Sequence, residues 1–317
     1  MGATEQTIFD QFPYWRKAAG ALELLPKAGL TAFVGCGSSY NLALTLAATA
    51  NARGWQAVAV PGDEWTSRRS LYWAGTGSVQ VVAISRSGET TETVAAAKAS
   101  RSAGIPVIGI TVESGSSLAA NSDRVVAAET DKREGIVMTT SASLMLQLGL
   151  QLLGVTVPET AIAAAEAVLK SVDAQVPALL GGRSHFVYLG SGAQYGVGVE
   201  GALKLMEMSQ AMTQAFHPLE YRHGPISLID GQSVVVMLHS ADGLAAELKV
   251  ADEVRAKGAV VISLGGPGEL GFAVDVAPEL RPLVYLPALQ ILGERVAQAR
   301  GLDTAAPRHL TKVVVLA

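Results

Sequence analysis

This sequence has little cysteine and no large excess of charge of either sign. The 317-residue chain has one cysteine, Cys36, and a formal net charge of −4. A single thiol excludes an intrachain disulfide framework and a metal site made of several cysteines. The near balance of charge and the scattered basic residues give no footprint for nucleic acid or for an anionic membrane surface. We therefore expect neither as a partner.

Long apolar runs are also missing. No stretch of about 18 apolar residues is free of polar groups, which excludes a helix that spans a membrane. The N-terminal segment, MGATEQTIFDQFPYWRKAAG, contains acidic residues and no apolar core, so it does not have the pattern of a signal peptide. The sequence therefore predicts a cytoplasmic location.

The chain is rich, by contrast, in small aliphatic residues. Hydrophobic residues make up 49% of the sequence and aromatic residues only 5%, so the apolar content is mostly Ala, Val and Leu. This mixture is typical of helices packed on both faces of a buried parallel sheet. The length is sufficient for two domains, each with a core of its own.

Apolar runs that end in Gly or Ser alternate with helical patterns along the first half. The expected strands cover residues 30–35, 78–84, 106–110 and 124–127, and the expected helices cover about 40–53, 90–103 and 141–153. This alternation indicates βαβ units. We therefore predict an α/β fold with a doubly wound, flavodoxin-like parallel sheet.

The second half repeats the plan of the first. The run VYLGSGAQY at 187–195 echoes AFVGCGSSY at 32–40, and later strands recur at the same offset of about 155 residues. We infer one domain duplicated, with domains at 1–156 and 157–317. The join is expected near 154–159, where Gly and Pro interrupt the helical pattern, and a helix at 160–178 is expected to connect the halves.

Two loops of the first half have the chemistry of a phosphate site. Residues 35–40, GCGSSY, and 85–90, SRSGET, each end a strand and open a helix. At such places hydroxyls and free helix N–H groups can surround phosphate oxygens. Ser87 or Thr90 alone can equally be a helix cap, but the cluster favours phosphate. The matching loop at 238–243 lacks the repeated hydroxyls, so we expect one phosphate site per chain.

The second half supplies candidate acid–base groups. Glu200, Lys204 and Glu207 recur at helical spacing and share one stripe of the helix expected around 195–209. The apolar face of that helix is assigned to Val199, Leu203 and Met206, with Met208 or Ala202 flanking it. A solvated face of ion pairs is the plain alternative, but the Gly- and Ala-rich surroundings favour a stripe that faces a cleft.

A rigid loop dense in titratable groups follows at 217–225, HPLEYRHGP. His223, next to Arg222 and followed by Gly-Pro, is a candidate for moving protons near neutral pH. A lone histidine is otherwise more often a structural hydrogen-bonding group. No spacing of the histidines suggests a metal site, and we expect neither a metal nor an organic cofactor.

Two further features have a plain interpretation beside a functional one. The C-terminal segment, PRHLTKVVVLA, is either an edge strand with solubilising charges or a place for an amine, Lys312, that forms a Schiff base with a sugar carbonyl. The residues alone favour the edge strand. Cys36, in a Gly-rich turn with no histidine nearby in sequence, is assigned to packing.

The motifs GCGSSY, SxSGET, EGALKxxE, ExxHGP and PRxLxK, in this order, resemble the sugar isomerase (SIS) family, in particular the tandem isomerase domain of glucosamine-6-phosphate synthase. The resemblance implies that Glu207 moves a proton between C1 and C2 and that Lys204 supports it. It also implies that His223 opens the sugar ring from the partner subunit of a homodimer, and that Lys312 forms the Schiff base. The implied substrate and phosphate contacts are Ser38, Ser39, Ser85, Arg86, Ser87, Thr90, Val137 and Thr139.

The chain also departs from the synthase. No glutaminase domain precedes the repeats and no cysteine follows Met1, so we expect no hydrolysis of glutamine. Arg86 and Arg222 stand where the synthase has Gln and Lys, and VMTTSA at 137–142 looks more like the stand-alone isomerase and deaminase relatives.

The activity predicted on this basis is conversion of glucosamine 6-phosphate to fructose 6-phosphate and ammonia. A fructosamine-6-phosphate deglycase and a ketose/aldose 6-phosphate isomerase without deamination remain alternatives. A non-catalytic sugar-phosphate sensor is less favoured, because the roughly thirty residues before the first strand are too few for a helix-turn-helix domain.

Overall fold

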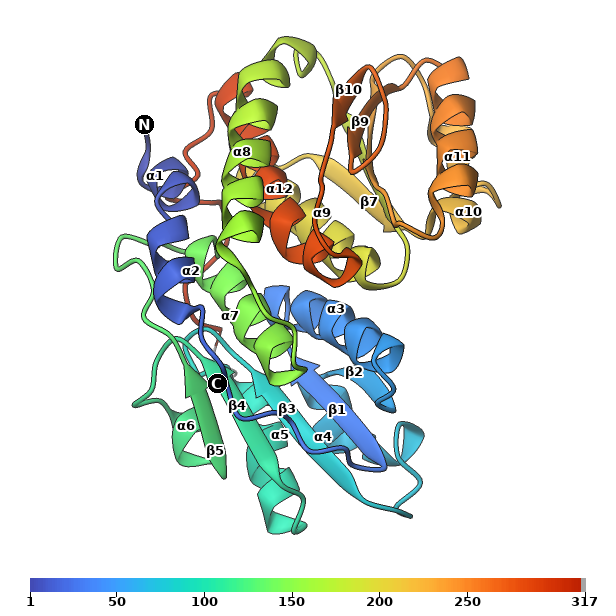
Figure 1. Ribbon diagram of the computed structural model, residues 1–317. Helices are drawn as coiled ribbons and strands as arrows, with labels where there is room; N and C mark the ends of the chain where they lie inside the picture. The colour runs from blue at the N-terminus through green and yellow to red at the C-terminus, as the bar shows by residue number, and fades with distance from the viewer. Residues whose placement is uncertain (315–317) are drawn as a thin grey trace. The chain divides into compact units, whose positions relative to one another are not determined.

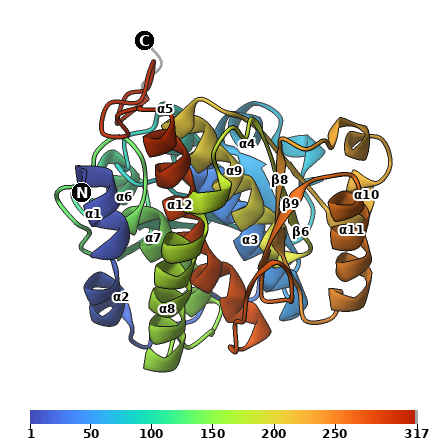
Figure 2. The ribbon, with the colours of Figure 1, turned by 90° about the horizontal axis from the view of Figure 1, so that it is seen from above.

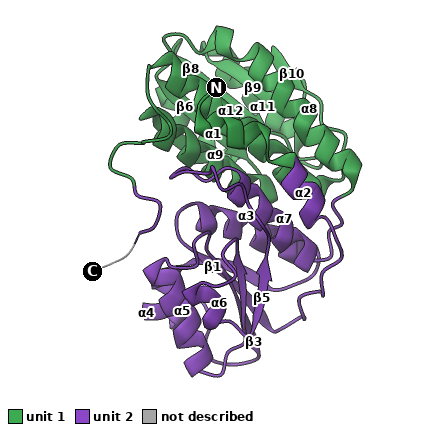
Figure 3. Cartoon of the chain, turned by 90° about the vertical axis from the view of Figure 1, so that its left-hand side faces the viewer, with its two compact units in different colours: residues 1–12, 158–310 green, residues 13–157, 311–317 purple. Residues whose placement is uncertain are grey.

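The computed structural model describes residues 1–314 and divides the chain into two compact units (Figure 3). Unit 2 comprises Pro13–Val157 and the tail from Thr311, and unit 1 comprises Met1–Phe12 and Pro158–Leu310. The break between 157 and 158 lies one residue from the boundary that the sequence predicts. The two terminal segments differ from that prediction, because each belongs to the unit formed by the opposite half of the chain.

Unit 2 is built on a five-stranded parallel sheet in the order β2-β1-β3-β4-β5. The strands are β1 (Leu30–Gly35), β2 (Ala57–Pro61), β3 (Val79–Ile84), β4 (Val107–Thr111) and β5 (Arg124–Ala127). The helices include α2 (Phe12–Ala18), α3 (Ser38–Ala52), α4 (Gly62–Ser67), α5 (Thr91–Ser102), α6 (Ser117–Ala120) and α7 (Thr140–Leu152). In Figure 3, α3 and α7 cover one face of the sheet and α4, α5 and α6 cover the other.

Helices on both faces explain the apolar strands of unit 2. Every residue of β3 is buried, because neither side of that strand meets water. On one face Trp65 is fully buried and donates a hydrogen bond to Ser100 Oγ at 2.9 Å. On the other, α3 and α7 pack so closely that a Cβ on Gly149 would lie 2.4 Å from the Leu46 side chain. The sheet therefore carries a core on each side.

Unit 1 repeats this layout with the strand order β10-β9-β8-β6-β7, which read from its other end is the order of unit 2. Its strands are β6 (His185–Gly190), β7 (Met212–Phe216), β8 (Ser233–Leu238), β9 (Val260–Leu264) and β10 (Leu270–Phe272). Its helices are α1 (Ala3–Phe9), α8 (Glu159–Gln175), α9 (Ala193–Ser209), α10 (Pro218–Tyr221), α11 (Leu244–Ala256) and α12 (Arg281–Ala299), which are labelled in Figure 2.

The turn after the first strand shows how closely the two units match. Gly37 has φ 55° and ψ −128°, and Gly192 has φ 54° and ψ −125°. A Cβ on Gly35 would lie 2.7 Å from the backbone of Ser39, and one on Gly190 would lie 2.6 Å from Gln194 O. Only glycine tolerates these conditions. The predicted fold, two similar doubly wound α/β domains in tandem, is confirmed.

No helix in the described residues 1–314 is long and apolar enough to cross a membrane.

Candidate functional site

The strand order determines where each unit can hold a ligand. In unit 2, β1 and β3 are neighbours, and the chain leaves β1 toward β2 and leaves β3 toward β4 on the other side (Figure 1). The loops that follow these two strands, 35–40 and 85–90, therefore meet at the carboxyl edge of the sheet. This place, the switch point of the sheet, is where doubly wound folds bind ligands.

The loop after β1 brings two hydroxyls and a helix N-terminus to the switch point. Ser38 and Ser39 are the first residues of α3 and are 6% and 5% exposed. Neither hydroxyl forms a hydrogen bond with another residue of the described part of the chain, while Ser39 N donates to Cys36 O at 3.1 Å. The free N–H groups of the first helical turn and these hydroxyls can donate to an anion.

The loop after β3 is held in one shape by its own hydroxyls. Ser85 Oγ accepts a hydrogen bond from Gly88 N at 3.1 Å and lies 3.3 Å from Thr90 Oγ1, and Ser87 Oγ accepts from Glu89 N at 3.2 Å. Thr90 is the N-cap residue of α5, but its side chain makes no capping hydrogen bond. The capping alternative therefore does not account for Thr90, and the loop offers a preformed row of hydroxyls.

Arg86, between these serines, points its guanidinium at other segments of unit 2. Nη1 donates to Gly135 O at 3.1 Å and to Ile136 O at 3.0 Å, and Nη2 donates to Lys312 O at 2.7 Å. Nη1 also lies 3.4 Å from Glu134 Oε1. The side chain is 10% exposed, so this arginine is a buried hub of hydrogen bonds.

Glu134 is the residue of this region that the sequence analysis missed. Its carboxylate is buried and accepts from Thr139 N at 3.2 Å, from Thr139 Oγ1 at 3.1 Å and from Ser141 N at 2.8 Å, and Ser141 Oγ donates to Oε1. It thereby satisfies the N-terminus of α7, which favours negative charge. Val137, between them, is buried. The available signal was an acid just ahead of the run Thr139-Thr140-Ser141.

Lys312 lies in unit 2, with the 35–40 and 85–90 loops and not with the second half. Its Nζ donates to Glu134 O at 2.7 Å. Residues 311–314 are not part of a strand, so the edge-strand interpretation has no support there. The remainder of the apolar end, 315–317, lies outside the described residues.

The charged stripe of α9 in unit 1 is buried. Lys204 is 1% exposed, with Nζ 2.5 Å from Glu207 Oε2 and 3.5 Å from Glu200 Oε1. The side chain of Glu200 is fully buried, whereas that of Glu207 remains 19% exposed. A solvated face of surface ion pairs is thus wrong. Two carboxylates compensate the buried ammonium, and Glu207 is the member whose side chain is partly exposed.

The apolar face of α9 also differs from the sequence expectation. Met206 is 45% exposed, and Val199 and Leu203 are only half-buried. The helix instead buries Val197, Gly201 and Leu205, together with Ala202 and Met208, the two residues expected to flank the face. The reason is close packing, because a Cβ on Gly201 would lie 2.8 Å from the Tyr188 ring and 2.9 Å from Leu289. Helical spacing defines faces but does not say which one is turned inward.

His223 follows α10 and is exposed. Its side chain forms no hydrogen bond with another residue in the described part of the chain. Arg222 binds Glu253 through Nε at 2.8 Å, and His217 stacks on Tyr195 with ring centroids 4.2 Å apart. The structure therefore unites Glu200, Lys204 and Glu207, but it shows no contact between His223 and that group.

Cys36 has the environment of a packing residue. Burial raises the pKa of its thiol, and Thr93 Oγ1 donates to Sγ at 3.6 Å. A raised pKa disfavours the nucleophilic thiolate. Within the described residues no group of three or more His, Cys, Asp or Glu side chains is placed to hold a metal ion.

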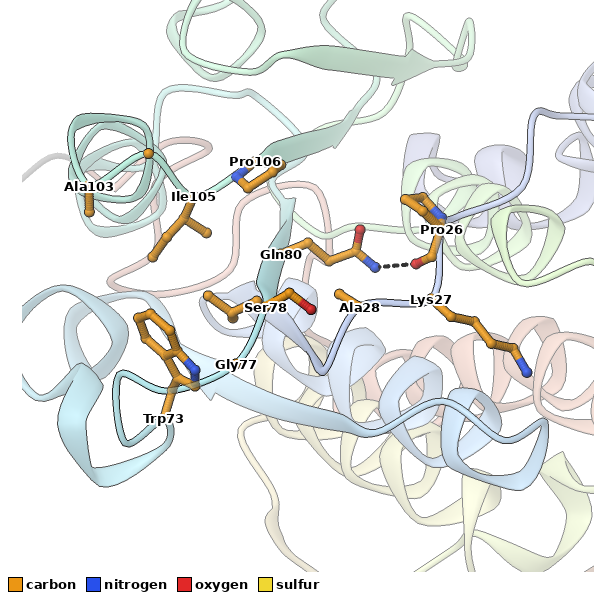
Figure 4. Close-up of a pocket in the computed structure, with 12 residues that line it drawn as sticks. Pro26, Lys27, Ala28, Trp73, Gly77, Ser78, Gln80, Ala103, Ile105 and Pro106 are labelled. Carbon is orange, nitrogen blue, oxygen red and sulfur yellow. Dashed lines mark hydrogen bonds between the residues drawn. The ribbon is translucent and has the colours of Figure 1, made fainter.

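A pocket of about 450 Å³ lies at the opposite, amino-terminal edge of the unit 2 sheet (Figure 4). Trp73, Ile105 and Pro106 line it, and Gln80 Nε2 donates to Pro26 O at 2.6 Å beside it. It contains none of the candidate site residues. The carboxyl edge of the sheet is therefore the candidate site.

Fold and site together define a class: tandem, doubly wound α/β proteins with a hydroxyl-rich switch point in one unit and a buried Glu-Lys-Glu cluster in the other. Residues 24–153 and 179–266 match the family model described as SIS domain. The chain belongs to the SIS domain family, and the resemblance expected from its motifs is confirmed.

Curated proteins with similar sequences are glutamine-dependent aminotransferases. The chain is 29% identical over 319 residues to the glutamine–fructose-6-phosphate aminotransferase (isomerizing) of Yersinia pestis and 30% identical over 308 residues to that of Pyrobaculum aerophilum. The alignments cover 89% of this chain and 51% of each relative, so the chain spans about half the length of the curated relatives it matches.

Solved structures match this chain over more than nine-tenths of its length. The glucosamine-6-phosphate deaminase of Thermotoga maritima has a TM-score of 0.87 and 29% identity, covering 99% of this chain and 100% of that one. The tagatose-6-phosphate ketose/aldose isomerase of Escherichia coli has a TM-score of 0.77 and 24% identity, covering 94% and 92%. The second likeness shows the fold alone.

Proposed function

We propose that the protein is a phosphosugar isomerase that deaminates glucosamine 6-phosphate to fructose 6-phosphate and ammonia. The observation that carries the proposal is Glu207, whose side chain is partly exposed and whose carboxylate lies 2.5 Å from the buried Lys204 ammonium. A placed carboxylate of this kind is suited to proton transfer. The full-length likeness to the Thermotoga maritima deaminase supports this choice of substrate.

The phosphate of the substrate would bind at the switch point of unit 2. Ser38 and Ser39 have hydroxyls without partners in the described chain, and the 85–90 loop adds Ser85, Ser87 and Thr90. The phosphate is remote from the reacting carbons, so its binding energy serves to orient C1 and C2. Val137 and Thr139 are proposed as neighbouring contacts to the sugar.

The chemistry requires ring opening, one proton shift and hydrolysis. His223 would open the ring. Glu207 would remove the proton from C2 of the open-chain aldose and return it to C1 of the enolamine. The imine that this leaves at C2 is hydrolysed by water, which supplies the ketone oxygen and releases ammonia. Lys204 would keep Glu207 in place as its charge changes.

The test is release of ammonia and fructose 6-phosphate from glucosamine 6-phosphate without added glutamine. Glu207→Gln should lower kcat by about 10²–10⁴-fold, the usual contribution of a general base. Glu166→Gln is a matched control, because Glu166 pairs with Lys170 on the surface of α8 in the same unit. Full activity of Glu207→Gln would contradict the assigned role of the carboxylate.

Two other activities remain as outcomes of this assay. The tail amine of Lys312 supports an isomerase that binds keto-sugars without deamination, because an amine can form a Schiff base with the ketone. Such an enzyme would interconvert aldose and ketose 6-phosphates and release no ammonia. A deglycase would release an amino compound from a fructosamine 6-phosphate while leaving glucosamine 6-phosphate unchanged.

A homodimer in which His223 acts across subunits belongs to the same proposal. Exposed apolar side chains of unit 1, Met212 at 79% and Leu228 at 56%, support an interface there. Mixing inactive Glu207→Gln and His223→Asn chains should then restore about a quarter of the wild-type sites, because each mixed dimer has one intact site. A site made within one chain would restore none, and light scattering gives the mass.

A further inference from the structure

The guanidinium of Arg86 donates hydrogen bonds to other residues of unit 2. The backbone of this residue is held by Thr111 Oγ1, which donates to Arg86 O at 3.1 Å. The side chain then reaches three carbonyl oxygens and approaches one carboxylate, in two segments far apart in sequence. A planar fork with five donors is suited to such a task, and a lysine is not.

Glu134 makes the receiving segment rigid. Its carboxylate ties residues 134–136 to the first turn of α7 through Thr139 and Ser141. It is buried, and Arg86 is the cation beside it at 3.4 Å. A buried carboxylate without compensating donors would be costly. Arg86, the 134–136 segment and the start of α7 therefore form one connected group.

The tail is docked on this group through Lys312. Its carbonyl accepts from Arg86 Nη2 at 2.7 Å, and its ammonium donates to Glu134 O at 2.7 Å. Within the described residues, these are the hydrogen bonds that join residues 311–314 to other segments. The contact of the tail with unit 2 is thus specified at one residue.

We propose that Arg86 and Glu134 are positioning residues that clamp the C-terminal tail beside the phosphate loops and hold the Lys312 amine there. The proposal rests on the proposed function only in that the amine would face the sugar. Because Arg86 stands between Ser85 and Ser87, the same loop that would bind the phosphate also holds the tail. The clamp gives Arg86 a different role from the phosphate ligand that the family resemblance implies.

Limited digestion with trypsin tests the clamp without any assay of activity. Trypsin cleaves after Arg308 and Lys312, and mass spectrometry reports the rate of tail release. Arg86→Gln should speed release about 10-fold or more, as expected for loss of hydrogen bonds from a charged group. Arg86→Lys should recover only part of the protection. Arg101→Gln, an exposed arginine of the same unit paired with Asp123, should match the wild type.

Binding and turnover separate the two roles of Arg86. Under the clamp, the Kd of Arg86→Gln for inorganic phosphate stays within about 3-fold of wild type, while kcat for glucosamine 6-phosphate falls about 10–100-fold. Glu134→Gln should release the tail in the same way. Circular dichroism verifies that each variant is folded. If Arg86→Gln is not folded, Arg86→Lys tests the clamp in its place.

Unchanged tail protection in the folded arginine variants would overturn the clamp, and loss of phosphate binding with a protected tail would make Arg86 a phosphate ligand instead. If the wild type shows no turnover, the proposed function fails while digestion still decides the clamp.

Discussion

The loop after β3 in unit 2 and the loop after β8 in unit 1 share one hydrogen bond but use their polar groups in opposite ways. At the repeat offset of about 155 residues, Ser240 in unit 1 matches Ser85 in unit 2 and Gly243 matches Gly88, although Gly88 has φ +65° and Gly243 has φ −96°. Ser85 Oγ accepts from Gly88 N at 3.1 Å, and Ser240 Oγ accepts from Gly243 N at 3.0 Å. This hydrogen bond from a backbone N–H to a serine hydroxyl therefore recurs in both repeats, whereas the N-cap residue is Thr90 in α5 and Gly243 in α11.

In unit 1 a carboxylate from the protein itself occupies the switch point. Glu247, in the first turn of α11, accepts from Ser240 N at 2.9 Å, from Ser240 Oγ at 2.7 Å and from His239 Nδ1 at 3.2 Å. Burial raises the pKa of Glu247, but the hydrogen bonds from His239, Ser240 and Ser191 outweigh it, so that the pKa is lowered. The donors that could hold an external anion are already used.

The corresponding acid in unit 2, Glu92, does not close its loop. It stands in the first turn of α5, and its Oε2 makes no hydrogen bond in the described chain. Hydroxyls at one switch point and an internal carboxylate at the other give a physical reason for one phosphate site per chain, which stays a prediction. The polar groups at the two switch points thus differ between the repeats, together with the backbone at Gly88 and Gly243.

The largest expected effect comes from adding a methyl group to Gly88 in the unit 2 loop or to Gly243 in the unit 1 loop. Gly88 has φ +65°, and its Cβ would lie 2.0 Å from Ser116 Oγ, so Gly88→Ala should distort the 85–90 loop and weaken binding of the proposed substrate, glucosamine 6-phosphate, about 10-fold or more. Gly243 has φ −96°. Gly243→Ala should lower the free energy of unfolding by about 1–3 kcal/mol, through crowding of Ser240 and Glu247, and leave Kd unchanged.

Calorimetric titration and urea unfolding on both variants check this pair. Equal losses of affinity would mean that both switch points bind phosphate. That result would contradict the proposed difference between the two units.

A second prediction concerns the pH dependence of stability. Because the pKa of Glu247 is lower in the folded state, its contribution is present above the unfolded pKa, near 4.5, and is lost as pH falls through the folded value. Glu247→Gln should therefore be less stable than wild type at pH 7, by about 1–3 kcal/mol, and the two should converge in acid.

Urea unfolding between pH 3 and 7 measures that difference. Burial raises the pKa of Glu294 in α12, so Glu294→Gln provides a control in which the sign is reversed. A Glu247→Gln difference that grows in acid would contradict the interpretation.

The smallest effect is expected where the two repeats differ without consequence. Cys36 occupies the place of Ser191 in unit 1. Cys36→Ser should change kcat/KM by less than about 2-fold and stability by less than about 1 kcal/mol, because the thiol has a raised pKa and only packs against its neighbours. Steady-state kinetics and thermal unfolding measure both quantities, and a loss of activity above 10-fold would give Cys36 a chemical role.

Much of the fold could be predicted because the relevant signals are local. The strands expected at 30–35 and 124–127 have those bounds, and helices such as α7 begin within one residue of the expected position. The predicted connecting helix at 160–178 ends earlier, at Gln175. Apolar runs and turn glycines depend on neighbours in sequence, so the sequence shows them directly. The 155-residue repeat is found by comparing the two halves of the chain.

The site was predictable only where a motif carries it. The sequence alone determined the duplication, the hydroxyl loop at 85–90 and the charged stripe of α9. Only the tertiary structure decided that the stripe is buried, that Glu134 joins Arg86 to Lys312, and that Glu247 fills the second switch point. The physical reason is that burial and hydrogen bonding depend on which segments meet in space, and close packing at positions such as Gly201 selects the inward face.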